Sequence, residues 1–493
     1  MQRPNVVFVL TDDQGFWALG CAGNREIRTP NIDALAESGV FCENFFCVSP
    51  VCSPARASLL TGRIPSQHGI LDWLRTGNGG EDGEPVEYLA GMKGYADYLT
   101  EAGYRCGMSG KWHMGGSGTP QKGFSHWYAT LGGSGPYHDA QVYRDGKLTT
   151  EKRYLTEAIA QDALDFMGEC VADRVPFLSL VNFTAPHSPM VDQHPREYVE
   201  YYTRQCTFAD SPQDARHPWM PKHAIDIQYS QMLAGKERES VTVRDLIAGY
   251  YASIQAVDDQ VGRMVAQLRR LGVLENTLIL YSSDNGFSCG KHGIWGKGNA
   301  TFPNNMYDTS VKVPAIFAMP GRIARGVRTD AMLSGYDILP TLLDFCGVEN
   351  PDAKDLPGRS FLRLLETGGE DGRDSVVVFD EYGPARMVRT KEWKYVHRYP
   401  YGPHELYDLV QDPDEYWNLL EEGRILRHTP EEISGKVLEL RTYMESWFRR
   451  YTLPDRDGRH EPVSGRGQLR MLGESADGKL TFAPWKETEY RRG

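Results

Sequence analysis

The sequence contains no long apolar run. Within its 493 residues, no stretch approaches the ~18 consecutive apolar residues that a membrane-spanning helix needs. The first apolar run, residues 6–10, is far too short for the core of a signal peptide, and no cleavage site follows it. We therefore expect a cytoplasmic protein without a membrane partner.

An excess of positive charge is also missing. Lys and Arg together number 54 and Asp and Glu 66, so the formal net charge is −12. Without a basic excess, the chain does not supply the phosphate contacts on which general nucleic-acid binding depends. We expect no nucleic-acid partner.

No disulfide framework is visible. The cysteines number nine, an odd count, and 40% hydrophobic residues suffice for a core without cross-links. Cys42, Cys47 and Cys52 are spaced by five, which fits neither zinc pairs nor the common iron–sulfur runs. We expect reduced thiols.

Several catalytic motifs are absent as well. The chain has no Gly-x-Ser-x-Gly elbow, no His-Glu-x-x-His and no calcium-loop signature. The glycine-rich segment 290–298 is not a P-loop, because neither Ser nor Thr follows Lys297.

What is present is an alternation of continuous apolar strands with helices, which predicts an α/β fold with a large, mostly parallel sheet sandwiched by helices. From about residue 375, short strand candidates and a helix at 434–451 predict a smaller antiparallel subdomain. We place the catalytic domain at 1–370 and the subdomain, with an extended tail, at 371–493. The predicted strands of the large sheet are residues 6–10, 176–183, 277–281 and 313–318, and the helices of this part are 31–39, 56–61, 95–102, 245–271 and 336–345.

Polar pairs follow two of these strands directly. Asp12-Asp13 ends the first strand and Asp284-Asn285 the third. Each pair alone is typical of a solvated turn. Together, at the same edge of one sheet, they offer the oxygen ligands that Ca²⁺ or Mg²⁺ prefers.

The segment Cys52-Ser53-Pro54-Ala55-Arg56 leads into a predicted helix. Amides at a helix N-terminus bind anions, and Arg56 lies one turn from Cys52, so both can face one anion. A buried cysteine beside a helix cap is the simpler alternative. Further candidates are Lys111 and His113, which share a face of an extended segment, His187 in a proline-flanked loop, and Lys297 with His292 in the glycine-rich segment.

These segments together resemble the sulfatase family of the alkaline-phosphatase-like superfamily, over nearly the whole chain. Cys52-x-Pro54-x-Arg56 is similar to the family's Cys-x-Pro-x-Arg signature, and the residues up to Arg63 continue it. Further segments that match the family are residues 5–13, 29–35, 103–113, 283–297 and 405–413.

The resemblance implies a set of roles. A maturase would convert Cys52 to formylglycine (3-oxoalanine). One divalent cation, Ca²⁺ with Mg²⁺ or Mn²⁺ as alternatives, would be bound by Asp12, Asp13, residue 52, Asp284 and Asn285. The sulfate would be surrounded by Arg56, Lys111, His113, His187 and Lys297, with His292 as a further candidate.

The same resemblance implies a mechanism. A thiolate that attacked sulfur would give a thiosulfate with no easy exit, whereas an aldehyde hydrate offers two hydroxyls on one carbon. Asp284 would accept a proton from the attacking hydroxyl, and His187 with Lys297 would protonate the leaving alcohol. His113 would deprotonate the second hydroxyl, which expels sulfate.

We therefore expect a sulfuric ester hydrolase acting on a sulfated small molecule or saccharide. Alternatives are an aryl or alkyl sulfatase, a phosphonate monoester or phosphodiester hydrolase of the same superfamily, and a non-catalytic anion- or glycan-binding protein. The Asp284-Asn285 pair follows the ordinary sulfatase form, which counts against the phosphonate branch. A homo-oligomer is compatible with the sequence. Conceivable sugar contacts are Trp73, Trp127, Tyr137, His138, Trp219 and His223.

Overall fold

The computed structural model describes residues 3–75, 86–220, 240–369, 373, 377–379, 382–421, 427–473 and 480–484. No helix among these residues is both long enough and apolar enough to span a membrane. The predicted boundary between residues 370 and 371 and the candidate contact His223 lie outside the described residues.

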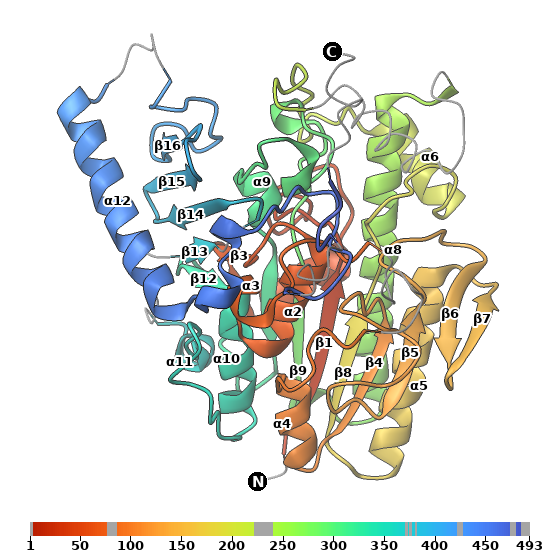
Figure 1. The fold of residues 1–493 in the computed structure, drawn as a ribbon. Helices are drawn as coiled ribbons and strands as arrows, with labels where there is room; N and C mark the ends of the chain where they lie inside the picture. Colours follow the sequence, from red (N-terminus) through yellow and green to blue (C-terminus); the bar gives the residue numbers. More distant parts are fainter. Residues whose placement is uncertain are drawn as a thin grey trace.

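A ten-stranded sheet forms the centre of the molecule (Figure 1). Its middle strands β9, β1, β8, β4 and β5 run parallel to one another. The strands in spatial order are β11 (Val327–Thr329), β2 (Val40–Cys42), β10 (Ala315–Ala318), β9 (Thr277–Ser283), β1 (Asn5–Thr11), β8 (Phe177–Asn182), β4 (Arg105–Gly110), β5 (His126–Thr130), β6 (Ala140–Arg144) and β7 (Lys147–Glu151).

The prediction of a mostly parallel sheet between helices is confirmed, with a difference at its edges. β10, predicted within 313–318, pairs antiparallel with both β9 and β2, and β5, β6 and β7 also pair antiparallel. An apolar run has the same composition in either direction, so it does not reveal the orientation of its strand.

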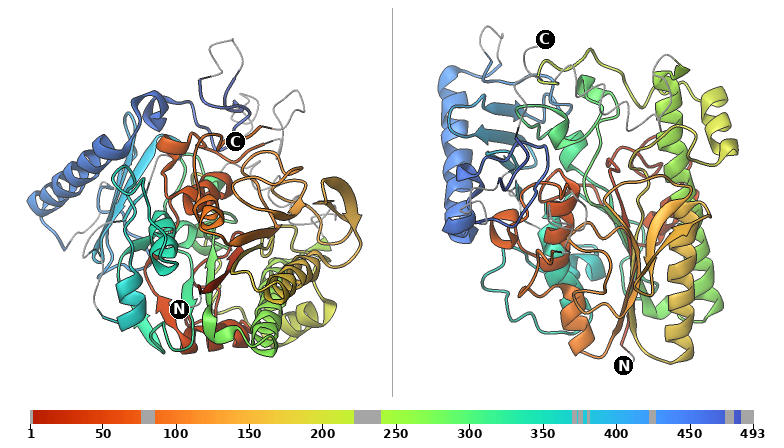
Figure 2. Two further views of the ribbon diagram at one scale, coloured as in Figure 1. Left: turned by 90° about the horizontal axis from the view of Figure 1, so that it is seen from below. Right: turned by 45° about the vertical axis from the view of Figure 1, so that its right-hand side comes forward.

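The sheet separates two hydrophobic cores because successive side chains of a strand point to opposite faces. Phe8 packs into one core and Val7 into the other. Helices α1, α5 and α8 cover the second face, and α2, α4 and α10 cover the first (Figure 2). The bounds of the helices of this part are α1 (Pro30–Ser38), α2 (Cys52–Thr61), α3 (Pro65–His68), α4 (Tyr95–Glu101), α5 (Leu155–Ala172), α6 (Arg196–Gln205), α8 (Val243–Arg270), α9 (Asp308–Val311), α10 (Ile338–Phe345) and α11 (Leu362–Thr367).

Local sequence signals explain where these helices begin and end. The side chain of Thr242 caps α8 by accepting a hydrogen bond from Asp245 N, and the Asp245 carboxylate in turn accepts one from Thr242 N. Gly62 ends α2 with a φ of 66°, a conformation that glycine adopts without strain.

The predicted antiparallel subdomain is present. Its sheet has the order β13 (Val377–Phe379), β14 (Ala385–Arg389), β15 (Trp393–Arg398) and β16 (Glu405–Asp408), and helix α12 (Pro430–Tyr451) packs on it. A further small sheet pairs β3 (Phe45–Phe46) with β12 (Leu333–Ser334).

A buried lysine ties this subdomain to the catalytic body. Lys394 of β15 is fully buried, and its ammonium group lies 2.6 Å from Asp308 Oδ1 at the start of α9. It also pairs with Glu415 and donates to the carbonyl oxygen of Met306 at 2.8 Å. Its neighbour in sequence, Lys391, makes an exposed ion pair with Asp330.

We expect Lys394→Met to lower the free energy of unfolding by about 3–5 kcal/mol, because it leaves the buried carboxylate of Glu415 without its cation and leaves Asp308 with its ion pair to Arg389 alone. Chemical denaturation followed by circular dichroism would measure the change. The matched control Lys391→Met should change stability by about 0–1 kcal/mol. Equal effects of the two substitutions would contradict this account of the interface.

Candidate active site

Two predicted polar pairs meet at the carboxyl edge of the sheet. β1 and β9 are parallel neighbours with Thr11 opposite Ser283, so Asp12 and Asp284 follow side by side. The backbone N of Asp13 donates to Asp284 Oδ1 at 3.2 Å, and Asn285 Nδ2 donates to Asp13 Oδ1 at 2.8 Å. The four side chains predicted as metal ligands are therefore in one buried cluster.

This cluster fits a divalent cation. One carboxylate oxygen of each of Asp12, Asp13 and Asp284 lies within 4.8 Å of the others. Asp12 Oδ1 and Asn285 Oδ1 are buried and have no hydrogen-bond partner among the described residues. Burial and the neighbouring Asp12 carboxylate raise the pKa of Asp284 to about 7. A bound cation would satisfy the free oxygens and relieve the repulsion between the carboxylates.

Cys52 is the first residue of α2 and is 3% exposed. Lys297 Nζ lies 2.7 Å from its Sγ, and Sγ lies within 4.8 Å of ligand atoms of Asp12 and His187. Burial and the Asp12 carboxylate raise the pKa of the Cys52 thiol to about 12. An unconverted Cys52 is therefore a protonated thiol at neutral pH, and a poor nucleophile.

Three cations hold the carboxylates in place. Arg56, one turn after Cys52, donates from Nε to Asp284 Oδ2 at 2.8 Å. Lys111, which follows β4, donates to Asp12, and Lys297 donates to Asp13. Burial opposes ionisation of Asp12, but Lys111, His187, Arg56 and Lys297 hold its pKa well below the usual range.

The two predicted histidines have different hydrogen bonds. His113 Nε2 donates to the carbonyl oxygen of Leu74 at 3.2 Å, which leaves the buried Nδ1 unprotonated and unpartnered. Burial and Lys111 hold the pKa of His113 well below 6.5. His187 Nδ1 donates to the Ser188 carbonyl oxygen at 2.8 Å, and its Nε2 faces Asp13 Oδ2 at 3.7 Å. Burial lowers the pKa of His187, although Asp12 and Asp13 oppose this effect.

His292 is placed apart from this cluster. Its ring stacks on Tyr307 with centroids 3.9 Å apart, and its backbone N donates to Asp214 at 2.7 Å. Burial and Lys291 lower its pKa to about 3. Neither contact reaches the carboxylates, so its role with sulfate stays a prediction.

Sequence reasoning missed several supporting residues. Tyr250 of α8 donates to the carbonyl oxygen of Asp13, whose φ of 64° turns its side chain toward the site. Asn182, at the end of β8, donates to the Lys111 carbonyl oxygen at 2.9 Å. Gly133 allows the approach of His113, because an added Cβ would lie 2.2 Å from the imidazole Cε1. Only Asn182, a polar residue near the end of the predicted strand 176–183, has a signal in the sequence.

The C-terminal tail packs beside Cys52. Gln468 N donates to the Trp73 carbonyl oxygen at 2.7 Å, and Trp73 Nε1 donates to Gly465 O at 3.3 Å. In the same loop, Leu74 N donates to the hydroxyl of Ser53 at 3.1 Å. The tail thus supports the loop whose Leu74 bonds both His113 and Ser53, the residue after Cys52.

The other conceivable sugar contacts have structural partners. Trp127 packs edge-on against Trp112 in the core, and the hydroxyl of Tyr137 donates to the His187 carbonyl oxygen at 2.6 Å. His138 packs against Tyr154, and Trp219 lies under the guanidinium of Arg398.

Comparisons with known proteins agree with this geometry. Residues 4–348 match the family model described as Sulfatase, and residues 290–442 match the one described as N-sulphoglucosamine sulphohydrolase, C-terminal. The N-acetylglucosamine-6-O-sulfatase of Bacteroides thetaiotaomicron is 28% identical, with 96% of this chain and 90% of the relative covered. The Ulvan-active sulfatase of Formosa agariphila is 30% identical, with 85% and 77% covered. A solved structure of a protein in complex with its substrate, D-glucosamine-2-N,6-O-disulfate, has a TM-score of 0.74 at 26% identity, covering 93% of this chain and 100% of that chain.

The fold and the site define an enzyme of the alkaline-phosphatase-like superfamily. The chain belongs to the sulfatase family, since the family model matches more than half of its length. It is a sulfuric ester hydrolase.

We expect Ca²⁺ to stabilise the chelator-treated protein by about 2.7 kcal/mol at 100 times its Kd, with a rise in Tm of several degrees. Asp12→Asn should abolish the Ca²⁺-dependent rise, because it weakens the cluster at a fully buried carboxylate. The matched control is Asp210→Asn, which alters a surface carboxylate paired with Arg25. This variant should keep the Ca²⁺-dependent rise in Tm. A rise in Tm that survives in Asp12→Asn would contradict the ligand assignment.

Proposed function

We propose that this enzyme removes sulfate from a sulfated saccharide, with residue 52 as formylglycine and one Ca²⁺ bound by Asp12, Asp13, Asp284 and Asn285. The observation that carries the proposal is the position of residue 52, which lies at the N-terminus of a buried helix between Lys297 and the carboxylates. A maturase that recognises the segment around Cys52 would supply the modification.

The substrate class is supported by the relatives. Their names include an N-acetylglucosamine-6-O-sulfatase and an ulvan-active sulfatase, and the related solved structure holds a sulfated glucosamine. We infer a sulfated carbohydrate from these names.

The cation and the formylglycine would supply distinct chemistry. When bound, the cation would lower the pKa of a coordinated hydroxyl and offset charge on the sulfuryl oxygens. Formylglycine, as its hydrate, would provide one hydroxyl to attack sulfur and a second to expel sulfate.

The chain's own cations bind and polarise the sulfate. Arg56 is fixed by Asp284 and by the Lys111 carbonyl oxygen, so its guanidinium needs little reorganisation during the reaction. Lys111 and Lys297 place two ammonium groups beside the carboxylates, where each can stabilise charge on a sulfuryl oxygen. All three side chains are buried, which strengthens these interactions relative to water.

The histidines move the protons. The unprotonated Nδ1 of His113 can accept a proton from the hydroxyl that expels sulfate. His187 holds a proton on Nδ1 for the Ser188 carbonyl, so donation to the leaving alcohol requires a second proton on Nε2. The charge of a bound sulfate ester favours that second proton, since a nearby anion stabilises the imidazolium.

We expect Cys52→Ala to fold normally and to lower turnover of a sulfate ester by about 10³-fold or more, because it removes the nucleophile. Turnover assays and a thermal melt would test this. Cys42→Ala, which alters another buried thiol, is the matched control and should retain activity.

Mass spectrometry of the peptide around residue 52 provides the second readout. In a host that has the maturase, the unsubstituted enzyme should carry an aldehyde at this position. Unmodified cysteine in an active preparation, or unchanged turnover of Cys52→Ala, would overturn the assignment.

We expect p-nitrophenyl sulfate to be hydrolysed faster than bis(p-nitrophenyl) phosphate, because the Asp284-Asn285 pair is the ordinary sulfatase form. N-acetylglucosamine 6-sulfate should have a kcat/KM about tenfold or more above that of p-nitrophenyl sulfate if remote contacts bind the sugar. A faster phosphodiester reaction would favour the phosphodiesterase alternative. A preference for the aryl ester would favour an arylsulfatase.

A further inference from the structure

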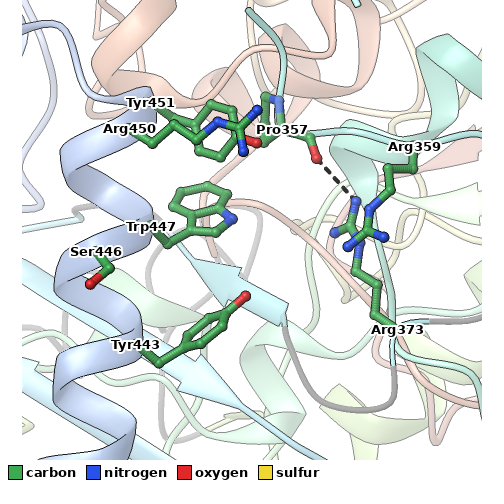
Figure 3. A pocket seen from close by; sticks show the side chains of 8 residues that line it. All are labelled: Pro357, Arg359, Arg373, Tyr443, Ser446, Trp447, Arg450 and Tyr451. Carbon is green, nitrogen blue, oxygen red and sulfur yellow. Dashed lines mark hydrogen bonds between the residues drawn. The ribbon is translucent and has the colours of Figure 1, made fainter. Parts of the chain in front are cut away.

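A cavity of about 290 Å³ lies between helix α12 and the chain segment that leads into the C-terminal subdomain (Figure 3). Its volume is close to the lower end of the range of small-molecule pockets, about 300–1,000 Å³. We call it the arginine–aromatic pocket. It is lined by Pro357, Arg359, Arg373, Tyr443, Ser446, Trp447, Arg450 and Tyr451.

The pocket carries a local excess of positive charge. Arg373 is bound by Asp337 at 2.7 Å and by the carbonyl oxygen of Pro357 at 3.0 Å. Among the described residues, the guanidinium groups of Arg359 and Arg450 form no ion pair, although the charge of Arg359 acts on the Asp337 carboxylate that already binds Arg373. None of the described lining residues is acidic, although the whole chain has a net charge of −12. Unpaired guanidinium groups around a cavity predict an anionic ligand.

The opposite wall is aromatic. Three aromatic residues of α12 follow one another at intervals of four and therefore form one stripe on the helix: Tyr443, Trp447 and Tyr451. Figure 3 shows the rings of Tyr443 and Trp447 turned toward Arg359 and Arg373. The guanidinium of Arg450 lies 5.0 Å from the centroid of the Tyr451 ring. The pocket therefore offers a flat apolar surface facing guanidinium groups.

This pocket is separate from the active site. α2 runs from Cys52 to Thr61, ten residues, which corresponds to about 15 Å of helix. Its far end, Gly62, lies against Tyr336, and the ring of Tyr336 packs on Trp447 with centroids 6.0 Å apart. The pocket thus lies at the opposite end of α2 from residue 52.

We propose that the arginine–aromatic pocket is a second, non-catalytic binding site for one sulfated sugar residue of the saccharide substrate. Each guanidinium fork can donate two hydrogen bonds to a pair of oxygens of the tetrahedral sulfate group, and the C–H face of the sugar packs on Trp447. The choice of a sulfated sugar over another anion rests on the proposed function. Binding at this site raises the local concentration of a multiply sulfated substrate near the enzyme.

Calorimetry on the full-length Cys52→Ala chain tests the site directly. The probe is a tetrasaccharide of N-acetylglucosamine 6-sulfate. We expect two binding sites per chain, and only one after the further exchange of Arg359 and Arg450 for Ala. Trp447→Ala should have the same effect, and Arg449→Ala, an exposed arginine outside the pocket, is the matched control. The unsulfated tetrasaccharide and sodium sulfate alone should leave the second site empty.

Kinetics on the active enzyme provide the second test. The pocket substitutions should raise KM for the sulfated tetrasaccharide about fivefold or more, and leave kcat/KM for p-nitrophenyl sulfate unchanged. A single binding site in Cys52→Ala, or unaltered binding in all pocket variants, would overturn the proposal. Equal binding of sodium sulfate would overturn the part that concerns the sugar.

Two further outcomes separate this proposal from others. If the pocket variants change the sedimentation coefficient, the pocket holds a second copy of the chain and the saccharide site is wrong. If the unsubstituted enzyme releases no sulfate from the tetrasaccharide while the second site still binds it, the proposed function fails and the pocket stands. If the enzyme releases sulfate from the tetrasaccharide but calorimetry finds no second site, the proposed function stands and the pocket proposal fails.

Discussion

Repulsion between buried carboxylates is the constraint around which the active site is built. Asp12, Asp13 and Asp284 are at most 4% exposed and place oxygens within 4.8 Å of one another. Such a cluster is costly in a low-dielectric interior unless positive charge surrounds it. Arg56, Lys111 and Lys297 supply that charge from three other segments of the chain. The three cations that we propose to bind the sulfate are thus also the groups that allow the carboxylates to be buried.

The fold provides this arrangement because most of the charged groups lie in, or directly after, a strand or helix of the central layers. β1 and β9 deliver the carboxylates, β4 delivers Lys111, and α2 delivers Arg56. In a parallel pair, a register slip of one residue would turn Asp12 away from Asp284 and separate the ligands. Polar contacts at both ends of the pair fix the register, since Asn5 Nδ2 donates to Thr277 Oγ1 at 3.3 Å and Asp284 N donates to the Thr11 carbonyl oxygen at 3.1 Å. The C-terminal tail then supports the loop that holds Leu74 against His113.

The sequence predicts the large elements and the charged residues of the site well, and their surroundings poorly. Apolar runs and the glycines that end helices are local signals. A motif with several fixed residues, such as Cys52-x-Pro54-x-Arg56, rarely matches by chance. Long-range pairings leave no such signal. The antiparallel direction of β10, the contact of Gly133 with His113, and the bond from Tyr250 to Asp13 all depend on segments that meet only after folding. His292 lies five residues before Lys297 in sequence, but its φ of 57° and its stacking on Tyr307 are features that the sequence does not predict.

The charge of the site resolves the conflict between an acidic protein and an anionic substrate. Asp12, Asp13 and Asp284 balance Arg56, Lys111 and Lys297 when all six are ionised, so the cluster by itself has no excess of either sign. A bound divalent cation adds two positive charges at the centre, and it also favours ionisation of Asp284, whose pKa is otherwise raised to about 7. The cluster then attracts a singly charged sulfate ester even in a chain of net charge −12. An extended polyanion gains no binding energy from this arrangement. The positive potential is confined to the buried site and is screened within about 10 Å at moderate ionic strength.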